Sequence, residues 1–312
     1  MKVGSASLVC VACIVVICSR GLSNEARPSI PEMVYLQGGA YRTQADPAKE
    51  IPPRDYSIDG FWIGRYEVTF EQFDQFCEET GYYLKRYRGI DRPNRSCVYR
   101  EMGADSSLRN YPAIRVCWLD ATAYCLWLRD KTGLPFRLPT QVEWEFACTS
   151  AGQDPGPTDN LERDRVAWYV GNELPRISQS QIQPVGGKSP NSHGLHDMLG
   201  NVWEWCLDGP TRFDYPEIVR EWEIVSPGLS PMDMDRGSPF LEAVSRVFQG
   251  PMGSAKALRG GAWCEPAERL CPSYRMFYRC NYCADRVGFR VLCPAAPNTP
   301  LLQPPAAKPA EP

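Results

Sequence analysis

Apolar and polar residues alternate along the first part of the chain in the way typical of β-strands. The alternation runs over residues 33–41 and meets Gly38-Gly39, which predicts a strand that enters a turn. A second strand region is predicted over 58–68, where large apolar residues cluster. The short segment Phe136-Arg-Leu138 predicts a third strand.

Three segments carry the start and stop signals of helices. Thr69-Phe-Glu-Gln72 has the form of a capping box, an apolar stripe follows it, and Gly81 predicts the end of this helix after about three turns. A second helix with one apolar face is predicted over 120–131, closed by Gly133. A second capping box, Thr140-Gln-Val-Glu143, predicts a third helix.

The C-terminal half is predicted to be largely irregular. Helical signals stop beyond Gly152, and glycine and proline punctuate short strands from there on. Residues 82–110 and 207–256 predict long loops, the second rich in Pro, Asp and Met. Residues 294–312 hold seven prolines and predict a disordered or polyproline tail. The chain is therefore expected to form one mixed α+β domain with a few helices and much irregular structure.

The N-terminus is predicted to be an export signal. Met1-Lys2 precedes an apolar run over 8–18 that is too short to be a stable membrane span. A small-x-small cleavage site at Gly21-Leu-Ser23 divides a signal peptide, 1–23, from a linker, 24–32. We therefore expect an exported protein, periplasmic or secreted, with no transmembrane helix in the mature chain. Cys18 could instead accept a lipid, although Ile17 before it is bulkier than such sites usually allow.

Charge and composition exclude several functions. A net charge of −3 and a pI near 5.6 argue against a nucleic-acid partner, because no basic excess exists to neutralise phosphates. His193 and His196 are the only histidines, which excludes zinc sites built on three histidines. Three of the 14 cysteines precede the cleavage site, so 11 remain, and most of these should pair in an oxidising compartment.

Residues 193–206 combine aromatic, acidic and glycine residues more densely than any other segment. Carboxylate and carbonyl oxygens at alternate positions suit calcium, which prefers several oxygen ligands in flexible geometry. The candidate ligands are the side chains of Asp197 and Glu204 and the backbone carbonyls of Gly200 and Val202. The alternative is a buried pair, Trp203 and Trp205, with the two carboxylates capping nearby amides.

The same segment, Gly194-Leu-His-Asp-Met-Leu-Gly-Asn-Val-Trp-Glu-Trp, resembles the signature of the formylglycine-generating enzyme (sulfatase-modifying factor) family. Six further stretches agree with that family in the same order: Met33-Val-Tyr-Leu-Gln-Gly-Gly, Tyr66-Glu-Val-Thr, Tyr124-Cys-Leu-Trp-Leu, Arg137-Leu-Pro-Thr-Gln-Val-Glu-Trp-Glu, Arg259-Gly-Gly-Ala-Trp and Gly288-Phe-Arg. The resemblance implies one domain over 33–293 with a fold likened to C-type lectins. It also implies one calcium ion, held by Asp197, Gly200, Val202 and Glu204.

The resemblance further implies a copper(I) site. Enzymes of the family bind copper(I) through two cysteines after the Gly-Gly-Ser motif and use oxygen to oxidise a substrate cysteine to formylglycine. Cys264 and Cys271 are the candidates here, and soft thiolates suit copper(I). They stand seven positions apart, a wider spacing than in the enzymes, and Ala262 occupies the position of the enzymes' serine. The alternative is a structural disulfide between them or with Cys280, Cys283 or Cys293.

Two function classes follow. The first is a copper-dependent oxidase that converts a cysteine of a client protein, such as a sulfatase, to formylglycine. The second is a non-catalytic, calcium-stabilised module that binds a protein or a glycan through the loops 82–110 and 207–256. A third, weaker pattern is Cys280-Asn-Tyr-Cys283, whose spacing would fit a four-thiolate zinc site together with Cys271 and Cys293.

Overall fold

The computed structural model describes residues 30–46, 51–82, 108–172, 181–210, 215–231, 255–294 and 296–302. The predicted signal peptide, most of the predicted linker and most of the two predicted long loops lie outside the described residues. No helix within the described ranges combines the length and the apolar character needed to cross a bilayer.

Two small sheets are built from the N-terminal part of the chain. In the first, β1 pairs antiparallel with β4, and β4 pairs antiparallel with β9 near the C-terminal end. In the second, β2 and β3 form an antiparallel ribbon. The bounds are β1 Met33–Leu36, β2 Gly39–Arg42, β3 Asp55–Ile58, β4 Phe61–Gly64 and β9 Leu292–Cys293. The strand region predicted over 33–41 is thus confirmed, broken by a turn, and the one predicted over 58–68 is confirmed in part, because β4 ends at Gly64.

The three predicted helices are present, with the predicted caps. They are α1 Phe70–Thr80, α4 Trp118–Thr132 and α5 Gln141–Cys148. Thr69 and Thr140 both close capping boxes, and Gly81 and Gly133 end α1 and α4 in the left-handed conformation. The prediction of a single apolar face on α4 is wrong, because every residue from 118 to 128 is buried. This helix runs through the core and packs on several neighbours at once.

The central sheet has four strands in the order β7-β6-β5-β8. Strand β5 carries the predicted site segment and lies between an antiparallel neighbour, β6, and a parallel one, β8. The bounds are β5 Trp203–Trp205, β6 Ala255–Arg259, β7 Arg275–Arg279 and β8 Val287–Gly288. The motifs around 203 and 288, which are far apart in sequence, therefore lie on adjacent strands.

Three expectations for the remaining chain are corrected. Helical structure continues beyond Gly152, in α6 Asn160–Val166 and α7 Tyr215–Val225. Arg137 forms one isolated bridge with Leu292 instead of a strand. Part of the predicted tail packs on the domain, because the Trp62 indole N–H donates to Ala296 O at 3.0 Å and Leu302 is buried. Short 3₁₀ turns complete the described chain at Ser226–Gly228, Ala267–Arg269 and Pro300–Leu302.

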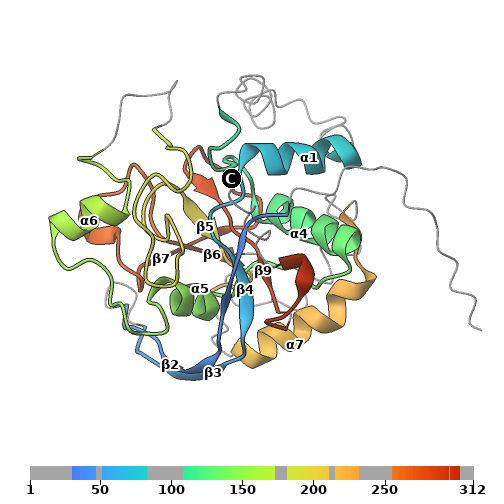
Figure 1. Ribbon diagram of the computed structural model, residues 1–312, viewed down its shortest axis with the longest axis horizontal. Helices are drawn as coiled ribbons and strands as arrows, with labels where there is room; N and C mark the ends of the chain where they lie inside the picture. The colour runs from blue at the N-terminus through green and yellow to red at the C-terminus, as the bar shows by residue number, and fades with distance from the viewer. Residues whose placement is uncertain are drawn as a thin grey trace, which may run out of the picture.

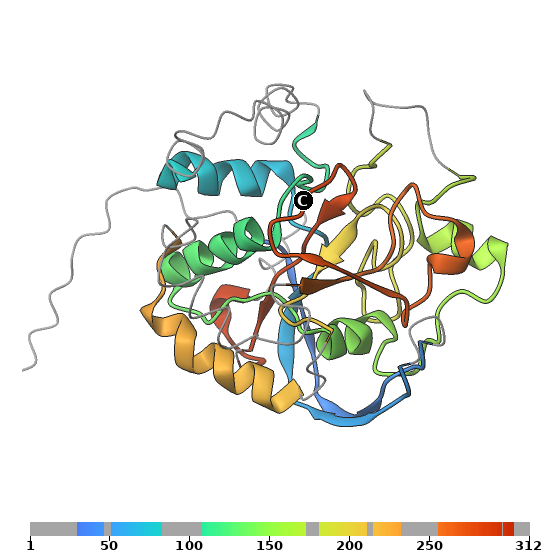
Figure 2. The same cartoon turned by 180° about the vertical axis from the view of Figure 1, so that it is seen from behind.

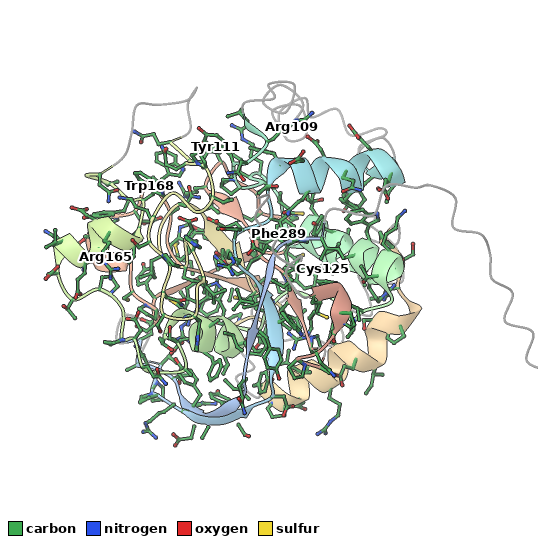
Figure 3. The ribbon with its side chains drawn as sticks, viewed as in Figure 1. Arg109, Tyr111, Cys125, Arg165, Trp168 and Phe289 are labelled. Carbon is green, nitrogen blue, oxygen red and sulfur yellow. The ribbon has the colours of Figure 1, made fainter. Side chains whose placement is uncertain are left out.

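The sheets separate helices α1, α4 and α7 from α6, which lies at the opposite edge (Figures 1 and 2). Phe289 and Cys125, the latter in α4, both lie in the interior (Figure 3). The Phe289 ring centroid is 5.4 Å from that of Tyr124 in α4 and 6.0 Å from that of Phe73 in α1. Aromatic packing thus fixes the first two helices against the C-terminal motif Gly288-Phe-Arg.

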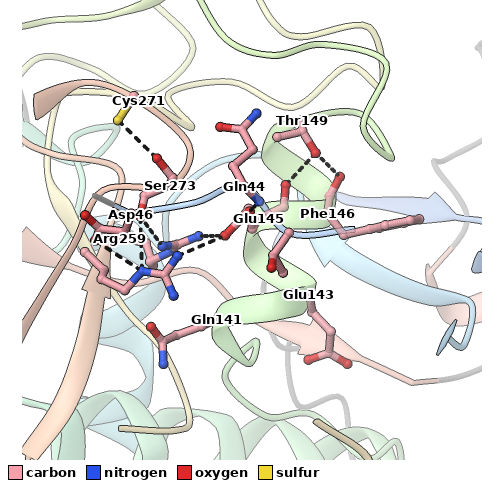
Figure 4. A network of polar contacts seen from close by, with 12 residues as sticks. Gln44, Asp46, Gln141, Glu143, Glu145, Phe146, Thr149, Arg259, Cys271 and Ser273 are labelled. Carbon is pink, nitrogen blue, oxygen red and sulfur yellow. Dashed lines mark hydrogen bonds and ion pairs between the residues drawn. The ribbon is translucent and has the colours of Figure 1, made fainter. Parts of the chain in front are cut away.

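A buried polar network joins α5 to the central sheet (Figure 4). Glu145 of α5 pairs with Arg259 of β6, and its other oxygen accepts the Gln44 backbone N–H at 2.6 Å and the Tyr41 hydroxyl at 3.2 Å. Arg275 of β7 lies 3.5 Å from the same carboxylate. One buried carboxylate therefore connects the N-terminal ribbon, α5 and two strands.

Candidate functional site

The segment 193–206 is a strained loop that runs directly into β5. Four of its residues have positive φ: Gly194, Asp197, Gly200 and Asn201. At Gly200 no side chain can be accommodated, because a Cβ would lie 2.2 Å from the carbonyl oxygen of Trp168. That close approach forms a short parallel bridge, in which Asn201 N–H donates to Trp168 O at 2.9 Å. The glycine is thus required by the approach of a second backbone.

Asp197 is buried and only half satisfied. Its Oδ2 accepts the Gly186 backbone N–H at 2.6 Å, whereas its Oδ1 has no hydrogen-bond partner among the described residues. Burial raises the pKa of Asp197 to about 6, and the Gly186 hydrogen bond and Arg290 oppose that rise. A buried carboxylate oxygen without a donor is costly unless a cation or a proton satisfies it.

Glu204 is fully engaged by protein groups. Arg290 Nη2 donates to its Oε1 at 2.6 Å, and Arg290 Nε and Trp144 Nε1 both donate to its Oε2 at 2.7 Å. Arg290 directs its other donors to the carbonyls of Gly64 and His196, at 2.9 Å each. Glu204 therefore forms a buried ion pair, and its role as a calcium ligand stays a prediction.

Glu67 is a member of this cluster that the sequence did not single out as a site residue. Its Oε1 accepts Asn201 Nδ2 at 3.1 Å, and its Oε2 is buried without a partner among the described residues. Burial raises the pKa of Glu67 well above its usual value, and the charge of Asp197 raises it further. The signal was the motif Tyr66-Glu-Val-Thr, which supported the family resemblance but had no assigned role.

The donor set of this cluster fits a hard divalent cation. Three buried carboxylates, Glu67, Asp197 and Glu204, face one directly bonded guanidinium, Arg290, while Lys188 adds a more distant positive charge near Asp197. Two carboxylate oxygens remain unsatisfied. No three His, Cys, Asp or Glu side chains of the described ranges are arranged to hold a metal by themselves. A calcium ion here would therefore need backbone carbonyls such as those of Gly200 and Val202 as well.

The predicted copper ligands lie on the loop that follows β6. Gly260 and Gly261 both have positive φ, and a Cβ at Gly261 would lie 2.4 Å from Leu270 Cδ2. This contact folds the loop back on itself between the two cysteines. Cys264 and Cys271 are half-buried free thiols, so neither forms the disulfide that was the alternative. Their sulfur atoms make no hydrogen bond with each other, and Cys271 Sγ lies 3.6 Å from Ser273 Oγ (Figure 4).

Aromatic and basic side chains lie around Cys264, and all of them are half-buried except Arg269, which is exposed. Burial raises the pKa of the Cys264 thiol, and the adjacent Arg286 guanidinium opposes that rise. We call this surface the thiol face; it consists of Cys264, Arg269, Tyr274, Tyr278, Tyr282 and Arg286. The Tyr278 and Tyr282 rings stack with centroids 4.1 Å apart, and Arg286 Nη2 lies 3.5 Å from the Tyr282 hydroxyl.

The thiol face rests on the site segment. The ring of Trp203 lies 5.9 Å from that of Tyr274, and its indole N–H donates to Glu265 Oε1 at 3.1 Å. Arg269 binds the other oxygen of Glu265 at 2.8 Å. Trp203 and Trp205 are both buried, as the structural alternative for this segment expected. Trp203 and Glu204 are successive residues of β5, and successive side chains of a strand point to opposite faces. The carboxylate cluster and the thiol face therefore lie on opposite sides of β5.

The four-thiolate zinc site is wrong. Cys293 is buried in β9, whereas Cys271, Cys280 and Cys283 are half-buried on the C-terminal loops. These four cysteines all fall within the described ranges, in which no three His, Cys, Asp or Glu side chains are placed so that they could hold a metal ion.

Comparison with known proteins agrees with this arrangement. A sequence model of the sulfatase-modifying factor enzyme 1-like domain matches residues 19–295. The formylglycine-generating enzyme of Streptomyces coelicolor is 32% identical, over 87% of this chain and 90% of that enzyme. The mouse formylglycine-generating enzyme is 28% identical over 60% of this chain, which spans only 61% of the mouse enzyme. Among solved structures, PvdO from Pseudomonas aeruginosa superposes with a TM-score of 0.58 at 25% identity, over 84% of this chain and 94% of PvdO.

Proposed function

Because this chain belongs to the sulfatase-modifying factor enzyme 1-like family, we propose that it oxidises a cysteine of a client protein, such as a sulfatase, to formylglycine. Copper(I) would be held by Cys264 and Cys271. The observation that carries the proposal is that both cysteines are half-buried free thiols on the Gly-Gly loop beside the thiol face. The predicted signal peptide would place this activity in the periplasm or outside the cell.

The residues present fit copper(I) by their chemistry. Thiolates are soft ligands, and two of them can hold copper(I) while leaving room for a third. When bound, the metal would supply the electrons that activate oxygen. The protein would supply the positioning: burial raises the pKa of Cys264, the Arg286 guanidinium opposes part of that rise, and the tyrosines of the thiol face offer apolar surface to a client peptide.

The test is co-production with a client that bears Cys-x-Pro-x-Arg, followed by mass spectrometry for loss of the cysteine sulfur. We expect conversion with the wild-type protein and none with Cys264→Ser or Cys271→Ser. The matched control is Cys280→Ser, another half-buried free thiol, which should leave conversion unchanged. Copper(I) binding to the reduced protein that did not depend on Cys264 and Cys271 would contradict the proposal.

A second candidate function is a non-catalytic module that binds a protein or a glycan. It is favoured by Ala262, whose side chain is buried and provides no hydroxyl where the family enzymes carry a serine. The aromatic and basic side chains of the thiol face are of the kind that dominates protein interfaces. In this case the client would stay unmodified in the same assay, and substitution of Tyr278 and Tyr282 by alanine would abolish its binding.

Under either function we propose one calcium ion at Asp197, with the Gly200 and Val202 carbonyls and the adjacent Glu67 and Glu204. At a calcium concentration one hundred times the dissociation constant, a native-only ligand stabilises a protein by about 2.7 kcal/mol, or about 5–10 °C in melting temperature for a domain of this size. We expect chelation with EDTA to lower the melting temperature by that amount, as measured by calorimetry.

The same experiment has a pH control. Because the pKa of metal-free Asp197 is raised to about 6, the proton bound to it stabilises the metal-free fold at low pH and is lost as the pH rises through 6. Calcium competes with that proton, so its stabilising effect should be small near pH ~5 and large near pH ~7.5. An unchanged melting temperature at both pH values would refute the calcium site.

A further inference from the structure

A cavity of about 450 Å³ lies beside α6, apart from the thiol face and from both predicted copper ligands. Its walls are formed by residues 154–158, by α6 and by residues 189–199. Arg165 and the neighbouring Trp168 lie on this side of the molecule (Figure 3). The volume is that of a pocket for a small organic molecule.

The walls of the cavity are fixed without a ligand. Asn191 Nδ2 donates to Ala147 O at 2.8 Å, and its Oδ1 accepts the backbone N–H of Leu195 at 3.1 Å. On the other wall, Asp154 Oδ1 accepts Gly156 N–H at 2.9 Å. Binding would therefore not need to order these loops, which lowers the entropic cost of association.

The polar part of the lining is acidic. Asp154 and Glu162 contribute two carboxylates against the single guanidinium of Arg165. Glu162 Oε2 accepts the Thr158 backbone N–H at 2.9 Å, so Asp154 and Glu162 each use one oxygen to hold the loop. The Asp197 carboxylate is buried within the wall and is not accessible from the cavity. A ligand that donates hydrogen bonds and carries positive charge would satisfy this lining.

The rest of the lining is apolar. Val166, Leu195, Met198 and Leu199 form a hydrocarbon surface next to the carboxylates. We propose that this cavity binds a small organic ammonium ion with an apolar body, whose amine is held by the carboxylates and whose hydrocarbon part contacts this surface. Desolvation of the hydrocarbon adds affinity, and the charge sets selectivity.

The proposal does not depend on the thiol chemistry, and it can be tested with three probes of equal chain length. We would measure binding of n-hexylammonium, n-hexanol and hexanoate by calorimetry in the presence of EDTA, so that no metal ion competes for the carboxylates of the lining. We expect n-hexylammonium to bind at least about tenfold more tightly than n-hexanol, and hexanoate not to bind. Absence of n-hexylammonium binding, or equal affinity for the alcohol, would overturn the proposal.

A pair of isosteric substitutions locates the charge recognition. Asp154→Asn with Glu162→Gln keeps an accepting oxygen for the loop amides but removes both charges, so the fold should be retained while n-hexylammonium affinity falls about tenfold. The control is Glu71→Gln, an exposed acid of α1 paired with Arg109. Unchanged affinity in the double variant would contradict the proposed contacts.

Discussion

Replacing Arg290 by glutamine is expected to lower the free energy of unfolding by about 3–5 kcal/mol, because it leaves a buried carboxylate without its charge partner. The guanidinium is fully buried and donates to both oxygens of Glu204. Among the residues that the structure describes, it is also the only guanidinium bonded to the cluster that contains Glu67 and Asp197. The loss should appear as a shift of the urea unfolding midpoint in EDTA with little change in slope.

Arg42→Gln is the matched control for this prediction. Arg42 pairs with Asp55 at 2.7 Å, but both side chains are more than half exposed, so the change should be under about 1 kcal/mol. The double variant Arg290→Gln with Glu204→Gln should recover part of the lost stability, because the unpaired charge is then gone as well. A loss at Arg290 no larger than that at Arg42 would show that the ion pair does not stabilise the fold.

Local signals predicted the parts of the fold that local interactions determine. The capping box at Thr69 and the stop at Gly81 bracket α1, and the box at Thr140 opens α5, because these contacts involve residues three to four positions apart. The two N-terminal strand regions were likewise predicted from local patterns, alternation over 33–41 and clustered large apolar residues over 58–68.

Elements that depend on tertiary packing could not be predicted in this way. Helix α4 is buried on all sides, so its apolar pattern has no single face from which orientation can be deduced. Helix α7 carries Pro216 in its first turn within a segment otherwise rich in loop-forming residues, and its buried Ile218 and Trp222 pack on the core. Neither the burial of α4 nor the packing of α7 can be deduced from the helix sequence alone.

The same distinction between local and long-range contacts applies to the candidate site. Asp197, Gly200 and Glu204 were singled out because the signature segment is continuous in sequence. The contact of Glu67 with Asn201, 134 positions away, and the ion pair of Glu204 with Arg290, 86 positions away, were not predicted. The ion pair between Glu204 and Arg290 joins two motifs that are far apart in the sequence, so neither motif predicts it alone.

Glu145→Gln is expected to destabilise the domain by at least about 3 kcal/mol, although it changes only an oxygen to an amide nitrogen. One carboxylate oxygen accepts from Gln44 N–H and Tyr41 hydroxyl, and the other faces Arg259 and Arg275 (Figure 4). Every neighbour is a donor, so whichever way the amide is turned, its NH₂ group meets donors on one side.

The charges around Glu145 predict the same loss of stability. Burial and the adjacent Arg259 lower the pKa of Arg275 to about 10, so both guanidinia stay positive at neutral pH, and Asp46, 3.5 Å from Arg275, and Asp208 would be left to balance them. Asp55→Asn, at an exposed ion pair, is the control and should cost under about 1 kcal/mol. Equal urea midpoints for the two variants would mean that water replaces Glu145 and that the network tolerates its loss. A large difference would show that this one side chain connects the N-terminal ribbon to the central sheet.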